Sequence, residues 1–185
     1  MSRKRSRITA AVALCALGVV SFAQPASAVQ GTRWYASASN CRTVYLNSKA
    51  SSYWVAAELG ADNRRLRART NGDNGLGAWE RFVLRGVGYD YTLQSSEGRY
   101  VSADLGGDGT LYARAEWPNA WEKFNIYTYQ DVDAHNSDIN ITSAANGRYV
   151  SADVSGDGTL RARATAPDRW EGFRIYLVED NAWSC

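Results

Sequence analysis

The sequence Gly-Arg-Tyr-Val-Ser-Ala-Asp at residues 98–104 recurs without change at residues 147–153. Each copy is followed by Gly-Asp-Gly-Thr-Leu, then Ala-Arg, and finally Trp-Glu-x-Phe. A third, more diverged copy lies upstream, with Leu-Arg-Ala-Arg at residues 66–69 and Trp-Glu-Arg-Phe at residues 79–82. The Trp-Glu pairs begin at Trp79, Trp121 and Trp170, so the spacings are 121 − 79 = 42 and 170 − 121 = 49 residues. Self-similarity at such a period indicates a repeat architecture.

Within each copy, short stretches of alternating apolar residues are separated by Gly, Asn and Asp, which is typical of half-buried strands. We expect four strands in each copy, and in the second copy they cover about residues 91–95, 100–104, 111–115 and 121–127. The glycine-rich segment 105–109 supplies the positive φ angles of a tight hairpin. No segment after the N-terminal region shows a helical period, so the predicted fold class is all-β.

Two architectures accommodate three four-stranded units. A three-bladed propeller is one, but propellers usually have ~4–8 blades. A closed barrel capped by hairpins fits better, because closure leaves no exposed sheet edge.

The repeated pattern Leu-x-Ser-x-x-(Asn/Glu)-Gly-x-Tyr-Val-Ser-Ala-Asp, Gly-x-Leu-x-Ala-Arg and Trp-Glu-x-Phe resembles the fascin-like branch of the β-trefoils, bacterial secreted type, over about residues 43–178. The resemblance implies a single β-trefoil domain with repeat 1 at about 43–86, repeat 2 at 90–130 and repeat 3 at 137–178. It also implies that the first strand of repeat 1 lies beside the last strand of repeat 3. β-Trefoils include lectins, protease inhibitors, cytokines and actin bundlers, so the fold does not decide the function.

The N-terminal region has the features of an export signal. Residues 1–7 carry four basic residues and no acidic one, an apolar run follows to Phe22, and Ala26-Ser27-Ala28 matches a signal-peptidase site. The apolar run is shorter than the ~20 residues of a membrane span. We therefore expect a signal peptide at residues 1–28, a mature β-trefoil domain at residues 29–185, and a secreted, extracellular protein.

Removal of this segment changes the net charge. It holds 4 of the 21 Lys and Arg and none of the 19 Asp and Glu, so the mature chain has 17 − 19 = −2. A chain of this charge has no strongly basic surface for a nucleic-acid backbone. We expect a monomer that binds neither nucleic acid nor, after signal cleavage, a membrane.

Two cysteines remain in the mature chain, Cys41 near its start and Cys185 at its end. In an exported protein such a pair predicts one disulfide, and two free thiols are the alternative. In a trefoil, this disulfide would close the circle of repeats.

Residues that recur in all three repeats are assigned to the structure of the repeat. Four apolar positions are predicted to form the core: Leu46, Leu93 and Ile141; Val55, Val101 and Val150; Leu66, Leu111 and Leu160; Phe82, Phe124 and Phe173. An Arg on the third strand (Arg69, Arg114, Arg163) and a Glu before the fourth (Glu80, Glu122, Glu171) are predicted to form ion pairs. The recurrent Trp is predicted to be partly buried beside them, with three sugar-stacking platforms as the alternative.

Residues that are unique to one repeat indicate a specialised site. Trp117 has no tryptophan counterpart in the other repeats, and Tyr112 stands where repeats 1 and 3 have Arg. The alternation of the strand points Tyr112 outward. Flat aromatic faces with a polar neighbour, Asn119, are the composition of a sugar site, so Tyr112, Trp117 and Asn119 are the predicted ligand-binding residues. Scattered surface aromatics are the alternative.

No residue pattern predicts catalysis or a cofactor. His135, the only histidine, lies in a polar insertion between repeats 2 and 3, where we expect it to be solvated. Asp153-x-Ser155-x-Asp157-Gly158 matches the opening of a calcium loop, but Ala164 stands where that loop has a bidentate Glu. We therefore expect a turn there and no metal site.

These observations favour a secreted, non-catalytic carbohydrate-binding protein of the lectin-like β-trefoil kind, with a polysaccharide or glycan as partner. The Gln-x-Trp signature of ricin-type lectins is replaced by Trp-Glu-x-Phe, so ricin-type binding residues do not transfer. The alternative is a protein-interaction module, either a fascin-like actin or filament binder or a protease inhibitor.

Overall fold

The computed structural model describes residues 32–34, 41–128 and 136–178, which contain thirteen strands and two short 3-10 turns. The predicted signal peptide, His135 and Cys185 lie outside the described residues. Within these residues, no helix has the length and hydrophobicity of a membrane span.

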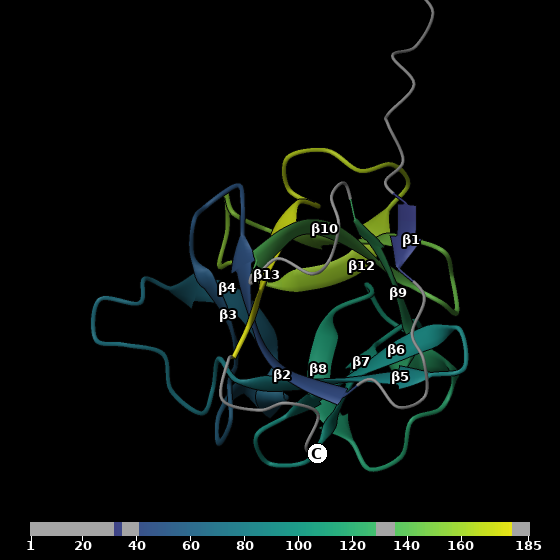
Figure 1. The fold of residues 1–185 in the computed structure, drawn as a ribbon, viewed down its shortest axis with the longest axis horizontal. Coiled ribbons are helices and arrows are strands. Elements are labelled where there is room, and N and C mark those ends of the chain that lie inside the picture. Colours follow the sequence, from purple (N-terminus) through teal and green to yellow (C-terminus); the bar gives the residue numbers. More distant parts are fainter. Residues whose placement is uncertain (1–31, 35–40, 129–135, 179–185) are drawn as a thin grey trace, which may run out of the picture.

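Six strands form a closed barrel (Figure 1). They are β2 (Cys41–Ser48), β5 (Phe82–Val87), β6 (Asp90–Ser95), β9 (Phe124–Thr128), β10 (Asn136–Ser143) and β13 (Phe173–Leu177). Each pairs antiparallel with the next in that order. Pairing of β13 with β2, with Ile175 opposite Leu46, closes the circle. The predicted contact between the first strand of repeat 1 and the last strand of repeat 3 is therefore confirmed.

Three hairpins complete the repeats. They are β3 (Trp54–Ala57) with β4 (Leu66–Thr70), β7 (Tyr100–Ala103) with β8 (Leu111–Ala115), and β11 (Tyr149–Ala152) with β12 (Leu160–Ala164). The hairpins meet one another through the isolated bridges Arg65 to Tyr112, Arg67 to Thr159 and Thr110 to Arg161. A six-stranded barrel with three hairpins is the β-trefoil arrangement, and it excludes the propeller.

Two details differ from the expected strands. The fourth strand of repeat 2 begins at Phe124 rather than at Trp121, because Trp121 lies in the 3-10 turn η2 (Ala120–Glu122). An additional strand, β1 (Thr32–Trp34), pairs with β9, and the Trp34 ring stacks on Tyr91 at 5.0 Å between centroids. The second turn, η1 (Asp62–Arg64), lies in the repeat-1 hairpin.

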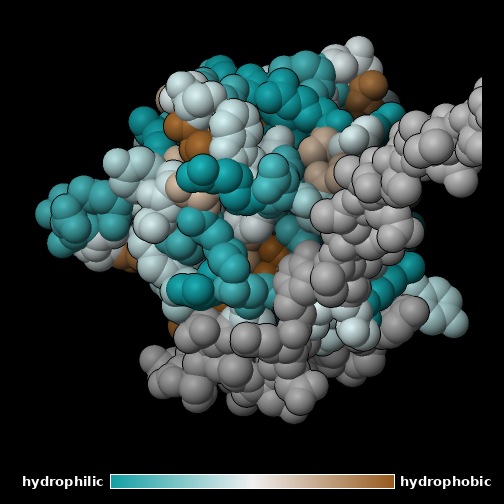
Figure 2. Space-filling view, turned by 90° about the horizontal axis from the view of Figure 1, so that it is seen from above, coloured by the Kyte–Doolittle hydropathy of each residue, from teal (hydrophilic) through white to brown (hydrophobic). Residues whose placement is uncertain are grey.

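The predicted core is confirmed, since each of its twelve side chains is at most 5% exposed. The core strands alternate buried and less buried positions, as in Phe124–Thr128, so every second side chain points inward. Burial of each such apolar side chain contributes ~1.5–3 kcal/mol to folding. On the face shown in Figure 2, the coloured residues are mainly hydrophilic or intermediate, with small apolar patches between them.

Two glycines connect neighbouring repeats. Gly158 has a φ of +76°, and its carbonyl accepts a hydrogen bond from the backbone N–H of Ala68 at 2.8 Å. Gly109, with a φ of +81°, makes the same contact with Ala162. A Cβ atom on Gly158 would lie 2.5 Å from the Ala68 carbonyl oxygen. The Gly-Asp-Gly motif thus serves the contact between repeats as well as the hairpin turn.

The predicted Arg–Glu ion pairs are wrong. Arg69 pairs with Glu58, and Arg114 pairs with Asp104 at 3.3 Å. The recurrent Glu instead accepts the backbone N–H of the residue three positions earlier: Gly77 for Glu80, Asn119 for Glu122 and Asp168 for Glu171, at 2.8 to 2.9 Å. Because each Glu is buried while each Arg is exposed, the carboxylate binds the nearby turn amide.

Cys41 is 7% exposed at the start of β2. Since Cys185 is outside the described residues, the disulfide between them stays a prediction.

Candidate functional site

A groove of about 890 Å³ lies in repeat 3, between the end of β12 and the turn that precedes β13. This volume is in the range of ~300–1,000 Å³ that small-molecule sites occupy. Nine residues line what we call the repeat-3 groove: Ser151, Arg163, Ala164, Thr165, Ala166, Asp168, Arg169, Trp170 and Glu171.

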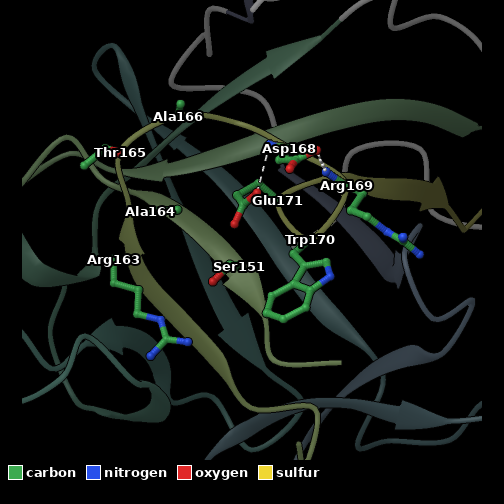
Figure 3. A pocket seen from close by; sticks show the side chains of 9 residues that line it. All are labelled: Ser151, Arg163, Ala164, Thr165, Ala166, Asp168, Arg169, Trp170 and Glu171. Carbon is green, nitrogen blue, oxygen red and sulfur yellow. Dashed lines mark hydrogen bonds between the residues drawn. The ribbon is translucent and has the colours of Figure 1, made fainter. Parts of the chain in front are cut away.

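The side chains of the groove come from three segments (Figure 3). Ser151 projects from β11, Arg163 from β12 and Trp170 from the turn. The Arg163 guanidinium and the Trp170 indole extend toward the same side with Ser151 between them, whereas Arg169 points away (Figure 3). The groove therefore has a flat aromatic wall, a hydroxyl and a cation.

Backbone contacts hold the turn of the groove in place. The Trp170 carbonyl accepts the N–H of Ala152 on β11 at 2.9 Å. The Glu171 carbonyl accepts the side-chain amide of Asn140, 3% exposed on β10, at 2.7 Å. Together with the bond from the Asp168 N–H to the Glu171 carboxylate, these contacts attach the turn to the barrel and to its own hairpin. The backbone that carries the indole is thus hydrogen-bonded to both β10 and β11.

Two carboxylates lie in the groove, and both are engaged by backbone amides. Glu171 is 6% exposed, and burial raises the pKa of its carboxyl, with Arg163 acting in the opposite direction. Asp168 accepts the N–H of Arg169 at 2.7 Å and is exposed. Among the described residues, no cluster of three or more His, Cys, Asp or Glu could hold a metal ion.

The predicted site residues lie at the equivalent place in repeat 2. Trp117 is 74% exposed in the loop after β8, where repeat 3 has Ala166. Asn119, also exposed, corresponds to Asp168 and donates its N–H to Glu122 at 2.8 Å. Tyr112 is half-buried on β8 as the strand pattern predicts.

The structure does not show Tyr112 and Trp117 in contact. The Arg114 guanidinium covers the Tyr112 ring at 4.5 Å, and the Tyr112 backbone bridges to Arg65 of repeat 1, where the hairpins meet. No ring contact joins Tyr112 to Trp117 within the ranges that the structure describes. Ligand binding by Tyr112, Trp117 and Asn119 stays a prediction.

Sequence reasoning placed Arg163 and Trp170 in the scaffold because both recur, although it kept the tryptophans as alternative sugar platforms. It missed Ser151, Asp168 and the anchoring Asn140. One feature of the sequence could have indicated a different environment for Arg163. Arg161 stands where repeat 2 has Tyr112, and this changes the charge near Arg163.

No protein-family model and no curated protein sequence matches the chain. Solved structures do match. The designed three-fold symmetric protein ThreeFoil has a TM-score of 0.58 and 10% identity, over 72% of this chain and 97% of its own. A Polyporus squamosus lectin, bound to a sialylated trisaccharide epitope, has a TM-score of 0.56 and 15% identity, over 72% of this chain and 48% of its own.

A GlcNAcα1-4Gal-releasing endo-β-galactosidase from Clostridium perfringens has a TM-score of 0.59 and 10% identity, over 75% of this chain. The match spans only 33% of the length of that enzyme. At these identities the likenesses show the fold, an all-β β-trefoil.

Proposed function

We propose that the chain is a carbohydrate-binding module and that the repeat-3 groove holds a sugar ring against Trp170. The observation that carries the proposal is the position of the Trp170 indole: its backbone carbonyl bonds to β11, and Ser151 and Arg163 line the same groove. Support comes from structural neighbours, which include a lectin and a sugar-releasing enzyme.

The chemistry of the groove suits a saccharide. The axial C–H groups of a sugar ring form an apolar face that packs on an aromatic ring, while its hydroxyls need donors and acceptors. Arg163 supplies hydrogen-bond donors, and the exposed carboxylate of Asp168 supplies acceptors. The Ser151 hydroxyl both donates and accepts. A groove that is open to solvent also accepts a residue within a longer polymer.

We further propose that the module is non-catalytic. Glycosidase sites contain a carboxyl with a raised pKa beside a second carboxylate. A catalytic role of Glu171 and Asp168 is therefore the alternative. Glu171 is buried, bonds the Asp168 N–H, and has counterparts with the same bond in Glu80 and Glu122. A contact made three times supports a structural role. A reducing-end assay on each bound polysaccharide should show no hydrolysis, and sustained release of sugar would overturn this part.

Replacement of Trp170 by Ala tests the site. Loss of one stacking platform costs ~1–3 kcal/mol by analogy with base stacking, so binding should weaken about 5- to 150-fold. Trp79→Ala is the matched control, because Trp79 occupies the equivalent turn of repeat 1 with the same backbone bond, to Ala57. Affinity electrophoresis on a polysaccharide panel measures the effect. Equal losses in the two variants would contradict a repeat-3 site.

Trp117→Ala, in the same assay, tests the site predicted in repeat 2. An exposed Trp117 should give a variant of unchanged melting temperature. If this variant alone loses binding, the site lies in repeat 2. If no glycan binds, the fascin-like alternative of a protein partner gains weight, and actin co-sedimentation tests it.

Export is proposed on the N-terminal signal pattern, and with it the Cys41–Cys185 disulfide. Mass spectrometry of the exported chain should find residue 29 at its N-terminus and, after unreduced digestion, the two cysteines in one linked peptide. Labelling of both thiols without a reductant would contradict the disulfide.

A further inference from the structure

The three repeats differ in what holds the recurrent arginine of the third strand. In repeat 1 Arg69 binds Glu58, with Nη2 and Oε2 separated by 2.6 Å. In repeat 2 Arg114 binds Asp104 at 3.3 Å and lies over the Tyr112 ring. In both repeats the acidic partner follows the first strand of the hairpin that carries the arginine, so the arginine is neutralised within its own repeat.

Repeat 3 has an acid at the same position, Asp153, but a different residue binds it. Arg161 occupies the place of Tyr112, and its Nη1 lies 3.1 Å from Asp153 Oδ2. The other carboxylate oxygen of Asp153 accepts the hydroxyl of Ser155 at 3.3 Å. Arg161 is itself fixed by a second bond, from its Nε to Asp108 at 2.8 Å.

Arg163 is therefore left without the partner that its counterparts have. Its side chain is exposed in the groove, and no ion pair or hydrogen bond joins it to the residues that the structure describes. The two carboxylates of the groove are bonded to backbone amides, Glu171 to that of Asp168 and Asp168 to that of Arg169. Arg163 therefore extends into the groove beside Trp170 without a bonded partner among the described residues, whereas Arg169, the other cation that lines the groove, points away (Figure 3).

We propose that the repeat-3 groove selects an anionic saccharide, with Arg163 pairing with its carboxylate or sulfate group while the sugar ring packs on Trp170. A planar guanidinium donates two parallel hydrogen bonds to either group. The equivalent places in repeats 1 and 2 lack this site because Glu58 and Asp104 bind their arginines. This inference rests on the proposed carbohydrate-binding function.

Matched polymers test the charge preference. Polygalacturonate is compared with its fully methyl-esterified form, and dextran sulfate with dextran, so the two pairs distinguish carboxylate from sulfate. The protein should bind at least one anionic polymer about 10- to 100-fold more tightly than its neutral match, as expected for charge-assisted hydrogen bonds. Arg163→Gln should remove this preference, whereas Arg114→Gln, the repeat-2 control, should keep it.

A second variant closes the site without altering any residue of the groove. Arg161→Tyr recreates the arrangement of repeat 2 and releases Asp153, which should then bind Arg163 and reduce the affinity for the anionic polymer about as much as Arg163→Gln does. Asp108→Asn is its control, because it removes the other partner of Arg161 and leaves the contact with Asp153. Melting curves confirm that each variant is folded.

The outcomes separate the two proposals. Trp170-dependent binding with no preference for the anionic polymer would overturn the inference and leave the proposed function intact. Absence of binding to all four polymers and to the wider panel would overturn the proposed function. Equal losses from Arg163→Gln and Arg114→Gln would refute a single site in repeat 3.

Discussion

Gly158→Ala tests whether the contact between repeats, rather than the hairpin turn alone, requires glycine. Gly147 is the matched control, since its φ of +67° is similar to the +76° of Gly158. No atom lies within 4 Å of a Cβ on Gly147, whereas a Cβ on Gly158 would lie 2.5 Å from the Ala68 carbonyl oxygen. The two substitutions thus share a backbone cost and differ in the steric conflict with repeat 1.

The left-handed backbone conformation should cost an alanine ~1–2 kcal/mol at either position. Forcing a methyl group into a packed contact adds ~1–3 kcal/mol at Gly158 alone, where the conflict is with the backbone of β4. Gly158→Ala should therefore lower the free energy of unfolding by ~2–5 kcal/mol and Gly147→Ala by ~1–2 kcal/mol. At ~2–4 °C per kcal/mol, the melting temperature should fall by about 4–20 °C and 2–8 °C respectively.

Urea denaturation measures the difference, provided that both variants keep the parental dependence on urea concentration. Gly109→Ala should behave like Gly158→Ala, because its Cβ would lie 2.9 Å from the Ala162 carbonyl oxygen. Equal destabilisation of Gly147→Ala and Gly158→Ala would refute the role assigned to the inter-repeat contact.

Three further substitutions have defined outcomes. Tyr91→Phe should leave the free energy of unfolding, measured in urea, unchanged or raise it by up to ~1 kcal/mol, because the buried Tyr91 hydroxyl has no hydrogen-bond partner among the described residues. A large decrease in this free energy would indicate that the hydroxyl has a partner. Hydrogen bonds from the Thr110 hydroxyl and Arg161 lower the pKa of Asp108 to about 2, so its stabilisation is complete above about pH 4 and is lost as the pH falls to 2. For this exposed carboxylate, Asp108→Asn should cost under ~1 kcal/mol at pH 7, and the cost should vanish near pH 2 in a pH series of melting curves. Asn140→Ala leaves the Glu171 carbonyl without its side-chain donor, so it should lower the free energy of unfolding by ~1–3 kcal/mol and weaken saccharide binding. Unaltered binding would show that the turn keeps its shape without Asn140.

The fold was largely predictable because the repeat shows it three times. Leu93, Val101, Leu111 and Phe124 each have two counterparts, and strand alternation alone places all of them in the core. The start of the fourth strand was misplaced because a Trp-Glu pair before an apolar run looks like strand, and only the local backbone shows that η2 interrupts it.

The candidate site was less predictable. Trp117 was selected because it occurs in one repeat alone, whereas the groove lies at Trp170, which has a counterpart in each repeat. Repeats 2 and 3 have similar residues around these tryptophans. They differ in which polar groups already form hydrogen bonds or ion pairs, and the amino-acid sequence does not show this.

The number of repeats, most of their strands and the side chains of the core can be read from the amino-acid sequence, because they follow from local alternation and from the turns that Gly and Asp permit. The pairing of charges is visible only in the folded chain. Arg161 reaches both Asp153 of its own hairpin and Asp108 of the neighbouring repeat, across 53 residues of sequence in the second case. Ion pairs depend on distances between segments that the chain brings together only on folding. The exposure of Arg163, without an ion pair to any residue that the structure describes, is a consequence of that assembly.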